Sequence, residues 1–240
     1  QSAKTVKKIS LALGGNAPFI VFDDADIDAA VDGAIACKFR NAGQTCVCAN
    51  RIYVHDNIYD DFAAKFTEKV RELKVGNGLE EGIKIGPLIN KAAIEKVEEL
   101  ISNATDNGAK IKAGGKRHDA GELFFQPTVL TGVNPSMRMA CEEIFGPVAP
   151  LFPFKDEADV IEQANNTEYG LAAYFYTQNH GRAWRVAEAL ESGVVGVNCG
   201  IVSNEIAPFG GVKESGIGRE GSKYGMDEFM EQKYILMSGI

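Results

Sequence analysis

Apolar residues along the chain follow two spacings that alternate from one segment to the next. Apolar side chains three and four residues apart predict amphipathic helices, and short alternating or continuous apolar runs predict strands. The helical spacing occurs in residues 27–37, 58–73, 94–104, 158–164 and 182–190. The strand pattern occurs in residues 8–13, 51–54, 109–113, 124–130, 171–176, 194–198 and 231–237. This alternation predicts an α/β fold.

Turn and cap residues mark where some of these elements begin and end. Asp26 is placed as the N-cap of the first helix, and Gly108 as the stop of the third. Residues 8–13 run into a Gly-Gly pair, which predicts a strand that ends in a tight turn. Because open α/β sheets bind ligands at the carboxyl ends of their strands, we expect residue 12 to stand at that edge.

The composition is that of a globular protein, and its charge excludes some partners. The chain has 240 residues, 45% apolar and 24% charged, with a formal net charge of -8. This acidic balance suits neither nucleic acid nor an anionic membrane, so we expect small molecules and protein as partners. No apolar run approaches the roughly 20 residues of a spanning helix, and the start lacks the apolar centre of a signal peptide.

The cysteines and histidines bear on compartment and metal binding. Five cysteines at irregular spacing do not predict a disulfide framework and favour a reducing compartment. We therefore expect the cytoplasm, with the mitochondrial matrix as the alternative. The three histidines are scattered, so no metal site is expected.

Cys46 is the candidate nucleophile, because it lies in a loop between a helix and a strand, outside any periodic apolar pattern. The thiolate is the reactive form, and Asn41, Gln44 and free backbone N–H groups of the loop would favour it. The alternative is a packing cysteine, which is what we expect Cys37 to be. Cys48 is placed to form a reversible disulfide with Cys46, or else packs at the start of a strand.

Four motifs in order resemble those of the aldehyde dehydrogenase superfamily. Residues 41–46 match its Asn-x-Gly-Gln-x-Cys signature, 11–16 its Glu-Leu-Gly-Gly motif, 142–147 its Glu-x-Phe-Gly-Pro motif and 208–211 its Pro-Phe-Gly-Gly motif. The resemblance spans essentially the whole chain. The sequence of residues 40–51 is most similar to that of the succinate-semialdehyde dehydrogenase branch. By contrast, residues 216–221 match the Gly-x-Gly-x-x-Gly dinucleotide-binding motif in sequence, but they follow a loop and precede no βαβ unit. We therefore do not expect them to bind a phosphate.

The resemblance implies roles for individual residues. Cys46 would be the nucleophile, Glu143 would hold the nicotinamide ribose, and Phe145 would flank it. Phe209 would form a wall of the substrate pocket, or, in the plainer interpretation, part of the core. The family's general-base glutamate is replaced here by Ala12.

Arg40 is the main clue to the substrate, because a cation six residues before the nucleophile can hold a carboxylate at the far end of a short aldehyde. The alternative is a surface arginine at a helix end. The resemblance to the semialdehyde branch favours the first interpretation, with Ser203 as the matching hydroxyl.

The resemblance also implies a layout in which the cofactor-binding half is absent from this chain. Residues 1–15 would be the last strand and motif on the cofactor-domain side, residues 16–228 the catalytic domain, an open twisted sheet with flanking helices, and residues 229–240 an oligomerisation-type strand. The expected cofactor is NAD or NADP. The expected partners are a small-molecule aldehyde, the missing N-terminal half and further copies, as a dimer or tetramer.

The implied reaction is oxidation of an aldehyde, succinate semialdehyde to succinate, through a thiohemiacetal and a thioester on Cys46. The fragment alone is expected to be inactive. Two alternatives stay open because of Ala12 and the truncation. One is a catalytically silent fragment or structural homologue. The other is an acylating dehydrogenase that transfers the acyl group of the thioester to coenzyme A.

Overall fold

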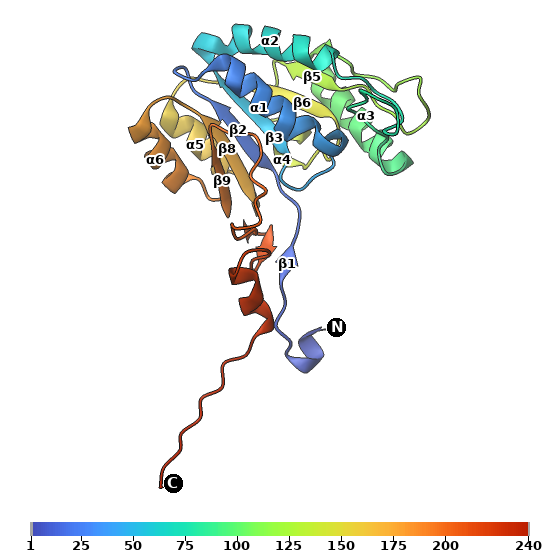
Figure 1. Cartoon of the computed structure of the whole chain (residues 1–240). Helices are drawn as coiled ribbons and strands as arrows, with labels where there is room; N and C mark the ends of the chain where they lie inside the picture. Colours follow the sequence, from blue (N-terminus) through green and yellow to red (C-terminus); the bar gives the residue numbers. More distant parts are fainter. Residues whose placement is uncertain (1, 240) are drawn as a thin grey trace.

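The computed structural model describes residues 2–239, and its core is a seven-stranded sheet (Figure 1). In spatial order the strands are β4 (Lys110–Ala113), β5 (Thr128–Thr131), β6 (Val148–Phe154), β3 (Ala49–His55), β2 (Ala17–Val21), β8 (Ala172–Tyr176) and β9 (Val194–Val197). Neighbouring strands are parallel except β4 and β5, which are antiparallel. The predicted α/β class, an open sheet with flanking helices, is confirmed.

Helices connect and cover these strands, as the periodicity predicts. They are α1 (Ile27–Phe39), α2 (Tyr59–Arg71), α3 (Lys91–Asp106), the short α4 (Arg138–Cys141), α5 (Glu157–Asn165) and α6 (His180–Ala189). Asp26 caps α1 by accepting a hydrogen bond from Ala29 N at 3.1 Å. Gly108 follows α3 with a φ of +99°, a conformation that glycine adopts without strain. Both predicted helix ends are confirmed.

The sequence patterns missed two central strands, β2 and β6. All five residues of β2 are buried, so no polar position alternates with the apolar ones. Parallel strands that are covered on both faces show this continuous pattern. Prolines at 18, 150 and 153 also disguise these strands, because proline usually argues against a central strand.

The strand predicted over residues 8–13 forms only in part, and it lies outside the main sheet. Only β1 (Leu11–Ala12) forms, and it pairs antiparallel with β11 (Gly216–Ile217) in a separate two-stranded ribbon. The leucines on either side of Ala12 are 40 and 47% exposed, so this segment has left the core. A second small ribbon joins β7 (Tyr169–Gly170) to β10 (Val212–Lys213).

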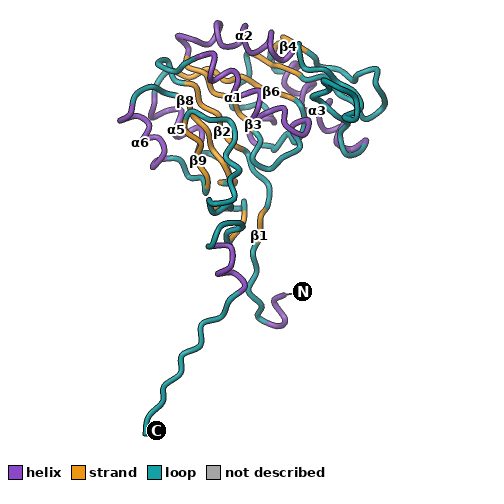
Figure 2. Tube along the Cα trace, in the orientation of Figure 1, coloured by secondary structure: helices purple, strands orange, loops and turns teal. Residues whose placement is uncertain are grey.

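The strand predicted over residues 231–237 does not form in the described chain. After the 3-10 helix η4 (Tyr224–Phe229), the chain continues as an unpaired extended tail that points away from the sheet (Figures 1 and 2). Tyr234 and Leu236 in this tail are 84 and 77% exposed. Within residues 2–239 the tail has no strand to pair with, which explains the difference.

No helix among residues 2–239 combines the length and the apolar character that crossing a bilayer requires.

A buried arginine ties the sheet to α5. Arg51 in β3 is 1% exposed, and its guanidinium donates to Asn16 O at 2.8 Å, Gln163 O at 2.7 Å and Ala164 O at 2.8 Å. Two of these carbonyls belong to the last turn of α5, where a cation is favoured by the helix dipole. Arg51 therefore fixes the segment that leads into β2.

Replacing Arg51 with methionine should lower the free energy of unfolding by about 3 kcal/mol, because buried carbonyl groups lose their donor. Urea unfolding of the chain measures this. The control is Arg71→Met, since the exposed Arg71 donates to Lys112 O at the surface. Equal losses in the two variants would contradict the structural role of Arg51.

Candidate active site

Three of the four motif segments meet at the amino ends of the parallel strands. The Gly-Gly pair precedes β2, the Cys46 loop precedes β3 and residues 142–147 precede β6. Since β2, β3 and β6 are neighbours and parallel, the three loops share one edge. Ala12 is the last residue of its strand β1, as expected, but β1 lies outside the main sheet, which the chain enters only at Ala17, after the Gly-Gly motif. The general rule that ligands bind at the carboxyl edge therefore does not apply to these three loops.

Main-chain contacts hold these loops together. Gly15 N donates to Glu143 Oε1 at 3.1 Å. A Cβ atom on Gly15 would lie 2.5 Å from Cys46 O, and one on Gly43 would overlap Gly146 O. Neither position has room for a side chain, so the three segments touch through their backbones.

The Cys46 loop starts with a left-handed turn directly after α1. Asn41, Ala42 and Gly43 have φ values of 53°, 55° and 76°. The side chains of Asn41 and Gln44 stabilise this turn: Asn41 Nδ2 donates to Gln44 O at 3.0 Å, and Gln44 Nε2 donates to Asn41 O at 3.2 Å. Gln44 Oε1 also accepts from Ile89 N at 2.9 Å. These amides therefore shape the loop through main-chain groups.

The surroundings of Cys46 disfavour its thiolate. Burial raises the pKa of the half-buried Cys46 thiol, and the nearby carboxylates of Glu143 and Glu220 raise it further. Backbone N–H groups of the loop oppose this shift only in part. The backbone N–H groups of the loop therefore act on the Cys46 pKa in the predicted direction, but burial outweighs them, and the Asn41 and Gln44 amides bond to main-chain groups instead.

Glu143 and Phe145 lie on the loop that contacts the other two. Burial raises the pKa of Glu143, and the hydrogen bond from Gly15 N opposes that shift. Phe145 is 38% exposed and has a left-handed φ of 52°. A residue with a Cβ adopts this conformation only where its surroundings enforce it.

The residues predicted to bind substrate lie on two other segments. Arg40 is exposed where α1 ends. Ser203 and Phe209 line one shallow groove of about 510 Å³, together with Glu220. Reciprocal backbone hydrogen bonds between Phe209 and Glu220 hold one side of it.

Ala12 has no titratable group, and in β1 it pairs with Gly216 and is exposed. The adjacent Ser215 is a structural residue that the sequence patterns missed. Its buried hydroxyl donates to Gly14 O at 2.7 Å and accepts from Gly170 N at 2.9 Å. Ser215 thus connects the late loop to the Gly-Gly segment. Its only signal in the sequence is its place in a glycine-rich stretch.

Cys37 and Cys48 are buried behind the loop, and Cys37 packs there as expected. The Cys48 thiol donates to Lys38 O at 3.1 Å. A disulfide with Cys46 would require this contact to break, and the redox hypothesis stays a prediction.

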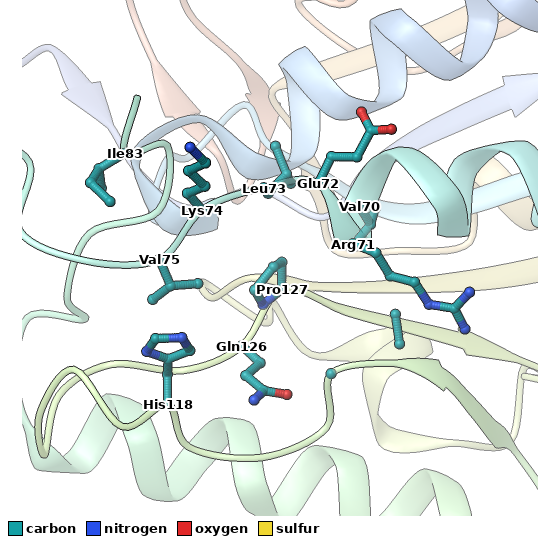
Figure 3. A pocket seen from close by; sticks show the side chains of 12 residues that line it. Val70, Arg71, Glu72, Leu73, Lys74, Val75, Ile83, His118, Gln126 and Pro127 are labelled. Carbon is teal, nitrogen blue, oxygen red and sulfur yellow. The ribbon is translucent and has the colours of Figure 1, made fainter. Parts of the chain in front are cut away.

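The structure has another cavity, of about 510 Å³, between the end of α2 and the loops around residues 83 and 114–127 (Figure 3). Arg71, Lys74, His118 and Gln126 are among its lining residues, but none of the predicted site residues is. We assign it no role. Among residues 2–239, no three His, Cys, Asp or Glu side chains are grouped as metal ligands would be.

Comparison with known proteins matches residues 1–235 to the aldehyde dehydrogenase family. The chain is 62% identical over 235 residues to the NADP⁺ succinate-semialdehyde dehydrogenase GabD of Escherichia coli, covering 98% of the chain and 49% of that protein. It is 59% identical to a 3-sulfolactaldehyde dehydrogenase of Pseudomonas putida, covering 100% of the chain and 49% of that protein.

Solved structures agree with this assignment. The crystal structure of succinate-semialdehyde dehydrogenase from Burkholderia pseudomallei matches with a TM-score of 0.94 and 63% identity, over 95% of this chain and 47% of that one. The chain spans about half the length of the curated relatives it matches. With three of its four motifs gathered at one edge of the sheet, the chain belongs to the aldehyde dehydrogenase family.

Proposed function

We propose that this chain is the catalytic half of an NAD(P)-dependent dehydrogenase that oxidises succinate semialdehyde to succinate. The observation that carries the proposal is the meeting of Cys46, Gly15 and Glu143 at one sheet edge. The relatives are about twice as long, which supports a separate half that binds the rest of the cofactor.

Cys46 would attack the aldehyde carbon, and N–H groups of its loop would donate to the developing oxyanion. Glu143 and Phe145 would hold the nicotinamide end of bound NAD(P), which would supply the hydride acceptor, and loss of hydride from the thiohemiacetal carbon would leave a thioester on Cys46. Water would then release the acid.

Glu143 fits the role of holding the nicotinamide ribose. One carboxylate oxygen, Oε1, accepts from Gly15 N, while Oε2 has no hydrogen-bond partner among residues 2–239. That oxygen is free to accept from a ribose hydroxyl. The exposed ring of Phe145 on the same loop can lie against the bound ring.

Arg40 and Ser203 would hold the distal carboxylate of the substrate. The two relatives described above are named for aldehydes that carry an anionic group, a carboxylate in one and a sulfonate in the other. A guanidinium group suits both anions. Succinate semialdehyde is proposed as the substrate because of the sequence of residues 40–51 and the names of the relatives.

The apolar segments near both ends of the chain are exposed, which supports a protein partner for each of them. Leu11, Leu13 and Ile217 near β1, and Tyr234 and Leu236 in the tail, are each at least 40% exposed. We propose that residues 1–15 adjoin the cofactor-binding half and that residues 229–240 pair with a second copy, in a dimer or tetramer.

The alternatives are a silent homologue and a dehydrogenase that transfers its acyl group to coenzyme A. The observation that favours them is Ala12, because no carboxylate stands where the family has its base.

In the full-length protein with Ala12, succinate semialdehyde and NAD(P) should give a burst of about one NAD(P)H per site, because the thioester forms but its hydrolysis lacks a positioned base. Ala12→Glu should raise the steady rate by about 10²–10⁴-fold. Rapid mixing measures both, and Cys46→Ala is the control without a burst. Steady turnover that Ala12→Glu leaves unchanged would show that another residue activates water.

Arg40→Ala in the same protein should raise KM for succinate semialdehyde about thirtyfold, since losing a charge-assisted contact costs about 2 kcal/mol. KM for an uncharged aldehyde of equal length should change little. Arg117→Ala, which breaks an exposed ion pair with Glu98, is the control. Similar losses with both aldehydes would remove Arg40 from the substrate site.

Alkylation of Cys46 by iodoacetamide should still increase above pH 9.0, the ordinary pKa of a thiol, because the site raises this pKa and so lowers the thiolate fraction at neutral pH. Peptide mass spectrometry of this chain at a series of pH values measures the rate, with the urea-unfolded chain as control. A rate that is already constant below pH 7 would contradict the finding.

A further inference from the structure

We infer that Asn50 is a positioning residue for Glu143, a role that rests on the proposed function of Glu143 as the ribose-binding carboxylate. Asn50 lies in β3, where it is 3% exposed in a run of otherwise mostly apolar buried positions. Among residues 2–239 its side chain hydrogen-bonds to neither the Cys46 thiol nor the Glu143 carboxylate. It acts through the main chain on both sides of Glu143.

The Asn50 amide brackets the peptide groups that flank Glu143. Asn50 Nδ2 donates to Glu142 O at 3.0 Å, and Asn50 Oδ1 accepts from Ile144 N at 2.8 Å. The opposite amide orientation would bring an oxygen to a carbonyl and an NH₂ to an N–H, so the network determines which way it points. Gly15 N donates to the Glu143 carboxylate, so Glu143 is held both through its flanking peptide groups and through its side chain.

A second buried amide, that of Asn16, hydrogen-bonds to Asn50 and extends this network. Asn50 Nδ2 also donates to Asn16 Oδ1 at 2.6 Å, while Asn16 Nδ2 donates to Ala140 O at 3.1 Å and Cys141 O at 3.2 Å. Arg51 in turn holds Asn16 O. The two amides thereby connect the Gly-Gly segment, β3 and the Glu143 loop in one hydrogen-bonded network.

The Glu143 loop needs such support, because regular structure does not provide it. The four-residue α4 ends at Cys141, and β6 begins only at Val148. Between them Phe145 has its left-handed φ of 52°. Asn50 accepts a hydrogen bond from the N–H of Ile144, the residue immediately before Phe145. This hydrogen bond therefore helps to enforce the left-handed conformation of Phe145.

The first test is hydrogen exchange in the 240-residue chain. Asn50→Ala should speed exchange of the Ile144 amide by roughly tenfold or more, because its buried acceptor is lost. Asn50→Ser, too short to reach both peptide groups, is the second variant should the first not fold. The control is Thr177→Val at the opposite edge, since Thr177 is also buried, at 2%, and its hydroxyl bonds to Asp24 at 2.8 Å. Unchanged exchange in the Asn50 variants would overturn the bracket.

The second test is kinetic and uses the full-length protein with succinate semialdehyde. Asn50→Ala should raise KM for NAD(P) about tenfold while KM for the aldehyde stays within about twofold, and Thr177→Val should change neither. A merely structural role would lower the active fraction and leave both KM values unchanged, which would overturn the inference. If the unsubstituted protein oxidises no aldehyde, the proposed function fails, whereas the exchange experiment still tests the bracket.

Discussion

The candidate site depends on a close approach of main chains at the amino edge of the sheet. Gly15 lies against Cys46 O and Gly43 against Gly146 O, where a Cβ would have no room. Side chains of ordinary size would separate the loops and break the hydrogen bond from Gly15 N to Glu143. The parallel register of β2, β3 and β6 brings the loops to the same edge, and the buried Asn16, Asn50 and Arg51 hold them there.

Electrostatics at this edge act against the chemistry proposed for it. Glu143 is proposed to hold the cofactor, yet its carboxylate raises the pKa of Cys46, which the burial of the thiol raises as well. Removing the carboxylate from water costs free energy, which the raised pKa of Glu143 also reflects. A bound ribose that donates to Glu143 would reduce its effect on the thiol.

The sequence predicted the fold class and most helices because apolar periodicity and caps such as Asp26 are local signals. It missed β2 and β6, since buried parallel strands lack alternation and here contain proline. Motif order identified the Cys46 and Glu143 segments. It did not determine the edge of the sheet at which they lie, because that depends on where the chain enters the sheet. Asn50 could not be recognised, because its partners at residues 142 and 144 are distant in sequence.

We propose that Cys46, at the meeting point of the three loops, carries the acyl group. Peptide mass spectrometry of the full-length protein, quenched in acid after mixing with succinate semialdehyde and NAD(P), tests this directly. The peptide that contains Cys46 should gain the mass of one succinyl group, and only when the cofactor is present. A succinyl group on Cys141 or Cys199 instead, or none on any cysteine while NAD(P)H forms, would contradict it.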